Sequence, residues 1–176
     1  PYAPRRATAS TIMDKLQLSQ DGAQRLARAG LHDSIVGCLV GSALGDAVGL
    51  YTEFLSGDMS AAAYPSRKFV LSPESQATPF RRDSHRGPHR PGEWTDDTDH
   101  AMLLLLSCLH NDLKALDPKD FAARLHIWVQ FGFLPLDTLP LGLGRTVGAI
   151  VRTKAYLDDP EATARRHWTN SKYNTS

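Results

Sequence analysis

The chain has 176 residues, of which 41% are hydrophobic and 22% are charged, and this allows one domain with its own core. Its 20 Lys and Arg residues balance 19 Asp and Glu residues, so the net charge of +1 argues against nucleic acid or an anionic membrane as a partner. The longest apolar stretch, residues 35–50, is short for a membrane span and contains Asp46.

Residues 1–30 predict a flexible leader with one accessory helix over residues 16–29, which Gly30 would end. The Arg and Ser residues of this leader faintly resemble an organelle transit peptide. The two cysteines, Cys38 and Cys108, lie in apolar runs and predict buried thiols in a reducing compartment. We therefore expect a cytoplasmic protein, with an organelle as the alternative.

A second helix is predicted over residues 35–49, where glycine recurs at every fourth position. Gly37, Gly41, Gly45 and Gly49 therefore share one side of the helix. Each interior glycine costs about 0.5–1 kcal/mol relative to alanine, so the bare stripe indicates close approach of another backbone or of a ligand. We expect helix packing at the first two positions, and a ligand is an alternative at the last two, which precede Glu53.

Residues 51–93 lose this periodicity and carry repeated Pro and Gly, which predicts a functional lid or an insertion. Residues 81–90 form a basic run that we interpret as a solvated loop, with contact to a substrate phosphate as the alternative. His85 and His89 have the spacing of zinc ligands, but no cysteine pair lies nearby, which argues against zinc.

The second half of the chain predicts further helices. One covers residues 97–109, and another begins at the cap-and-proline pair Asp117-Pro118 and ends near residue 131. Two more are expected over residues 145–157 and 161–168, with a proline- and glycine-broken loop over residues 133–144 before them. The predicted fold class is all-α, with five or six helices and no convincing strand.

The densest chemical signal is residues 92–100, in which three aspartates and two threonines precede an apolar run. One interpretation is helix capping, because Thr or Asp at a helix start satisfies free N–H groups. The other is a divalent cation, because clustered carboxylates repel one another unless a cation lies among them, and oxygen ligands without cysteine suit Mg²⁺. The pattern alone leaves both interpretations open, and it matches neither an EF-hand nor a nucleotide-binding loop.

Two motifs in this order, residues 37–49 followed by Glu53 and residues 94–98, resemble the ADP-ribosylglycohydrolase family. That family includes the dinitrogenase-reductase-activating glycohydrolase and the ADP-ribosylhydrolases. The resemblance covers residues 31–176 and implies an orthogonal helical bundle with two Mg²⁺ ions in an ADP-ribose cleft. It implies Thr95, Asp96 and Asp97 as metal ligands and Glu53 as the catalytic carboxylate.

The resemblance carries further implications for the rest of the chain. Asp46 matches its Gly-Asp motif and would hold the helix end in place, and Gly142 and Gly144 more weakly resemble a substrate-binding loop. Family members carry a second Asp-x-Asp-Thr motif near the C-terminus that this sequence lacks, so the chain resembles an N-terminal half and we expect no turnover by it alone.

The implied function is Mg²⁺-dependent removal of ADP-ribose from modified protein side chains or from small ADP-ribosylated compounds. A non-catalytic ADP-ribose-binding or interaction module is the second hypothesis, and a plain helical domain whose acids only cap helices is the third. Partners would be an ADP-ribosylated protein or an ADP-ribose-containing small molecule, with no nucleic acid and no membrane.

Overall fold

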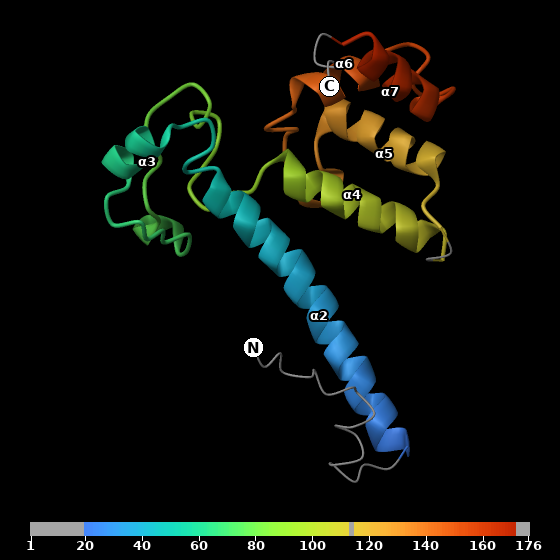
Figure 1. Ribbon diagram of the computed structural model, residues 1–176, viewed down its shortest axis with the longest axis horizontal. Coiled ribbons are helices and arrows are strands. Elements are labelled where there is room, and N and C mark those ends of the chain that lie inside the picture. Colours follow the sequence, from blue (N-terminus) through green and yellow to red (C-terminus); the bar gives the residue numbers. More distant parts are fainter. Residues whose placement is uncertain (1–19, 113–114, 172–176) are drawn as a thin grey trace, which may run out of the picture. The chain divides into compact units, whose positions relative to one another are not determined.

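The computed structural model describes residues 20–112 and 115–171, which form six α-helices and no strand (Figure 1). The all-α prediction is therefore confirmed for these residues. The helices are α2 (Gln20–Gly49), α3 (Gly57–Ala63), α4 (Asp96–His110), α5 (Pro118–Phe131), α6 (Arg145–Val151) and α7 (Pro160–Thr169), with short 3₁₀ turns at Glu74–Gln76 and Leu134–Leu136. The chain divides into two compact units, residues 1–42 and residues 43–176, and α2 crosses the boundary between them.

Helix α2 is continuous where the sequence predicted two helices. It passes through Gly30, whose carbonyl accepts a 2.8 Å hydrogen bond from the hydroxyl of Ser34 one turn later. One interior glycine costs only about 1 kcal/mol, which does not end a helix of 30 residues. The first part of the leader, residues 1–19, lies outside the described residues.

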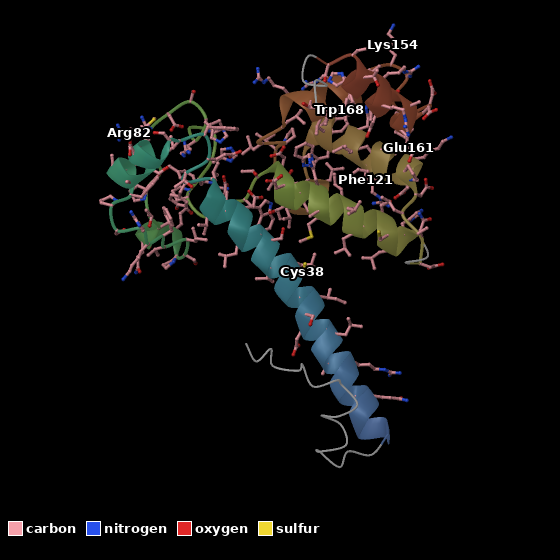
Figure 2. All side chains as sticks on the ribbon, in the orientation of Figure 1. Cys38, Arg82, Phe121, Lys154, Glu161 and Trp168 are labelled. Carbon is pink, nitrogen blue, oxygen red and sulfur yellow. The ribbon has the colours of Figure 1, made fainter. Side chains whose placement is uncertain are left out.

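The glycine stripe of α2 is divided between the two units. Within the first unit an added Cβ at Gly37 or Gly41 would meet no atom within 4 Å, and the same holds for Gly45 and Gly49 within the second, so the close packing expected at the first two positions stays a prediction. Cys38 on this helix is exposed and Cys108 is half-buried, so the prediction of two buried thiols is wrong for Cys38 (Figure 2).

By length and composition, the Arg28–Gly49 part of α2 is long and apolar enough to cross a membrane, a test that core helices of soluble proteins also pass. It is longer than the apolar stretch seen in the sequence because the helix continues through Gly30. The carboxylate of Asp46, near its end, is bonded to the start of α4, so this end of the helix belongs to the second unit.

The region predicted to be a lid or insertion is ordered around aromatic rings. Tyr51 is fully buried, its ring lies 4.7 Å from Phe69 and 4.5 Å from Phe80, and its hydroxyl donates a 2.8 Å hydrogen bond to the carbonyl of Thr78. The sequence analysis missed α3, which is short and begins at a Ser56 cap. Contacts between residues far apart in sequence order this region, and periodicity does not report such contacts.

The core of the second unit lies among α4, α5, α6 and α7. Figure 1 shows α4 beside α5, and α5 in turn packs against α6 and α7. The buried residues of this core are Leu103, Ala122, Leu125, Trp128, Phe133, Val151 and Tyr156. Helix α6 ends earlier than predicted, because the amide of Thr153 bonds the carbonyl of Ile150 in a tighter turn. The bundle therefore holds the start of α4 against the loop before α6.

Candidate functional site

The start of α4 is capped by a side chain from another helix. The carboxylate of Asp46 accepts hydrogen bonds from the amide and the hydroxyl of Thr95, at 2.9 and 2.7 Å. It also accepts from the amide and the hydroxyl of Thr98, at 3.0 and 2.6 Å. Thr98 is the third residue of α4, and its amide is the one that the side chain of an N-cap residue ordinarily satisfies.

This geometry shows which side chain caps the start of α4. Thr95 occupies the N-cap position, but its side chain makes no capping bond. Asp46, 49 positions before Thr95, supplies that bond instead, a more specific role than the one of holding the helix end that the resemblance implied. Asp96 and Asp97 are therefore not needed as caps, although their charges still favour the N-terminal end of the helix dipole.

Asp96 is half-buried beside the loop that precedes α6. Its Oδ2 accepts a 3.3 Å hydrogen bond from the amide of Gly144. A Cβ at Gly142, where φ is +82°, would lie 2.7 Å from Asp96 Oδ1. Burial raises the pKa of Asp96, and the charge of Asp97 raises it further, while His100 and the Gly144 amide act in the opposite direction. The structure thus brings Thr95, Asp96, Gly142 and Gly144 together.

Asp97 and Asp99 do not point to the same place. Asp97 is exposed, whereas Asp99 is buried and accepts the indole N–H groups of Trp94 and Trp128. Glu93, the other acid that the sequence placed in the cluster, pairs with Arg90 at 2.8 Å. Of the four acids in this stretch, Asp99 and Glu93 have partners elsewhere. Only the neighbouring carboxylates Asp96 and Asp97 therefore remain as candidate ligands.

Glu53, the predicted catalytic carboxylate, lies in the turns after α2. Its Oε2 is 2.9 Å from Nε2 of His85, and no hydrogen bond among the described residues joins it to Thr95, Asp96 or Asp97. Its backbone is held by Arg86, which is buried and donates to the carbonyls of Tyr51 and Glu53 and to the carboxylate of Asp83. The structure therefore groups Glu53 with the basic run.

The sequence analysis did not single out two residues that lie close to the predicted site residues, Arg86 and His100. Arg86 was counted with a solvated loop, yet it organises the turn that carries Glu53. His100 lies one turn after Asp96, its ring packs 4.6 Å from that of Trp128, and its buried Nε2 has no hydrogen-bond partner. Burial lowers the pKa of His100, which favours the neutral ring, although the nearby aspartates oppose this. One sign in the sequence that His100 lies near Asp96 is their spacing, because residues four positions apart are neighbours on a helix.

The side chains of Thr95, Asp96 and Asp97 offer oxygen atoms, which are the ligands that Mg²⁺ prefers. The Thr95 hydroxyl donates its proton to Asp46, which leaves its lone pairs free, and Asp96 and Asp97 add carboxylate oxygens. Among the described residues no cationic side chain is bonded to the half-buried Asp96, so a cation would relieve the cost that raises its pKa. No group of three or more His, Cys, Asp or Glu suited to a metal occurs among residues 20–112 and 115–171.

Comparison with known proteins identifies the family of this chain. The ADP-ribosylglycohydrolase family model matches residues 27–175. An uncharacterised protein of Archaeoglobus fulgidus is 33% identical over 117 residues, which cover 66% of this chain and 32% of that protein. The ADP-ribosylarginine hydrolase Tri1 of Serratia proteamaculans is 35% identical over 100 residues, which cover 57% of this chain and 22% of that protein.

The chain thus spans about a third of the length of the first relative and about a fifth of the second. No solved structure gives a significant match. Because the family match extends over most of the sequence, and its two motifs meet where Asp46 caps α4, this chain belongs to the ADP-ribosylglycohydrolase family.

Proposed function

We propose that this chain supplies one acidic wall of a Mg²⁺-dependent ADP-ribosyl hydrolase site, which removes ADP-ribose from protein side chains or from small molecules. Family membership supports hydrolysis of an ADP-ribosyl bond, and one relative is named for action on ADP-ribosylarginine. The observation that carries the metal assignment is the cap from Asp46, because neither Asp96 nor Asp97 is then needed to cap the helix.

The chemistry requires positive charge on the ribose ring in the transition state and a water molecule as the nucleophile. Bound Mg²⁺ would orient ribose hydroxyls and activate the water, and Thr95, Asp96 and Asp97 would hold it. Gly142 would keep its loop close to Thr95 and Asp96, and Gly144, where an added Cβ would meet nothing within 4 Å, would leave room for a sugar beside Asp96.

Glu53 would accept the proton from water in this scheme. Its present partner is His85, so the carboxylate must leave that imidazole, or pass the proton to it, when it acts as a base. The Glu53 and His85 side chains are 44% and 30% exposed, so this movement requires no unpacking of the core.

Calorimetric titration of the chain with Mg²⁺ tests the metal site. We expect binding heat for the native chain and its loss in the double variant Asp96→Asn, Asp97→Asn. The matched control is Asp117→Asn, which removes a carboxylate at the start of α5 instead. Equal heats for the native chain and the double variant would refute the assignment.

Release of ADP-ribose from an ADP-ribosylarginine peptide separates catalysis from binding. Metal-dependent release that Glu53→Gln abolishes supports a hydrolase. Because one wall of a site is expected to give no turnover alone, binding of Mg²⁺ and ADP-ribose without release is the result expected of this chain, and a non-catalytic ADP-ribose-binding module would give the same result.

A further inference from the structure

Asp99 makes an unusual set of bonds for an acid in a helical bundle. Its side chain is buried, with 4% of the residue exposed. One carboxylate oxygen accepts the indole N–H of Trp94 at 3.0 Å, and the other accepts the indole N–H of Trp128 at 2.8 Å. No ion pair with Asp99 occurs among the described residues, so two neutral donors hold this buried charge.

The two indoles belong to different parts of the second unit. Trp128 lies on α5 in the core, with 1% of its surface exposed. Trp94 directly precedes Thr95, the N-cap of α4 and a proposed metal ligand. Asp99 therefore ties the chain just before α4 to the interior of the bundle.

Packing alone does not explain a carboxylate at this position. A buried charge costs free energy unless its oxygens are fully bonded, and apolar side chains of similar volume often replace such groups without loss of stability. What two indole hydrogen bonds add is direction, because each N–H must point at one oxygen. Both rings are thereby fixed in orientation as well as in position.

Fixing Trp94 matters for the surface beside the proposed cation site. Trp94, Thr95 and Asp99 line one side of a pocket of about 270 Å³, and leucines from the loop before α6 line the other: Leu136, Leu139 and Leu141. Rotation of the Trp94 ring would change both this pocket and the backbone that leads into Thr95.

We propose that Asp99 is a positioning residue, which holds Trp94 against the start of α4 and so keeps Thr95 and Asp96 in the geometry that binds the cation. This inference rests on the proposed metal site, but it concerns the bonds of Asp99 and is testable separately. It also assigns a task to the third aspartate of the acidic stretch, which the metal site does not use.

The experiment uses the full chain with the variant Trp168→Phe as background, because Trp168 is 57% exposed and its emission would mask the other two indoles. Asp99→Asn places an amide N–H against one of the indole N–H groups, and Trp94→Phe keeps a ring but removes its donor. The control is Asp120→Asn. It breaks the ion pair in which Asp120 Oδ2 lies 2.7 Å from Nε of Arg124, and this pair is not part of the site.

We expect both site variants to shift the tryptophan emission and to weaken Mg²⁺ binding by about tenfold, the lower end of what groups that orient metal ligands contribute. The control is expected to leave the Mg²⁺ affinity unchanged. Native Mg²⁺ affinity in folded Asp99→Asn and Trp94→Phe would overturn the inference.

Should the native chain itself bind no Mg²⁺, the metal proposal fails and amide hydrogen exchange at Thr95 and Thr98 decides about Asp99. Faster exchange in both variants than in the control then supports its positioning role, and unchanged exchange overturns it. Trp94→Phe keeps the test decisive if Asp99→Asn does not fold, because it removes only one donor near the surface of the pocket.

Discussion

Replacement of Asp46 by alanine should destabilise the protein far more than the loss of an ordinary helix cap. One carboxylate satisfies two amides and two hydroxyls, and these belong to Thr95 and Thr98, which are 7% and 2% exposed. Since water cannot readily replace Asp46 there, the donors would remain unsatisfied.

The magnitude follows from the bonds that are lost. An ordinary N-cap contributes about 1 kcal/mol. A buried donor without a partner costs about 1–3 kcal/mol, and the four losses share one acceptor, so they do not add fully. We expect Asp46→Ala to lower the free energy of unfolding by about 3–5 kcal/mol, a large part of the total of about 5–15 kcal/mol for a domain.

Urea unfolding followed by circular dichroism, with chelator present to remove metal ions, measures this loss. The matched control is Asp117→Ala, which removes a cap with a single bond, 2.8 Å from the amide of Lys119, and should cost about 1 kcal/mol. Asp46→Asn keeps one acceptor oxygen and should fall between the two. If Asp46→Ala costs no more than Asp117→Ala, the reasoning from the four bonds is wrong.

Two further predictions concern the loops on either side of α4. The pKa of Asp83 is lowered chiefly by its hydrogen bond from the backbone of Arg86, so the stabilisation is present above about pH 4 and is lost as the pH falls through the lowered value. Asp83→Asn should therefore cost about 2–3 kcal/mol at pH 7, and urea unfolding at lower pH should show this gap closing; a constant gap would contradict the pairing. Gly142→Ala should cost at least about 1–2 kcal/mol, because φ is +82° and the new Cβ would lie 2.7 Å from Asp96 Oδ1. Gly144→Ala, where nothing lies within 4 Å, should change thermal stability by less than about 0.5 kcal/mol, and equal effects at the two glycines would refute this account.

The parts of the fold that the sequence predicted well have local causes. Helix α5 begins at Asp117 and Pro118 as expected, because a cap and a first-turn proline act on adjacent residues. The predicted end of this helix near residue 131 agrees with its last residue, Phe131. The apolar run after Asp97 likewise predicted α4 to within a residue at each end.

The errors arose where distant residues decide the structure. The predicted break at Gly30 is an exception with a local cause, because helix propensity outweighs a single glycine. Order in residues 51–93 comes from the rings packed on Tyr51 and from Arg86, neither of which has a periodic signal. Asp99 was counted with the acidic cluster, although its partner Trp128 lies 29 positions away.

By itself the sequence determined the helical class, the two family motifs and the kind of donor atoms in them, because residue type and short spacing carry that information. Only the tertiary structure decided which acid does which task. Asp46 caps α4 and Asp99 accepts from two indoles, so Asp96 and Asp97 are the acids that we propose as cation ligands. The physical reason is that a carboxylate takes its task from the donors that folding brings to it, and here several of those donors come from distant parts of the chain.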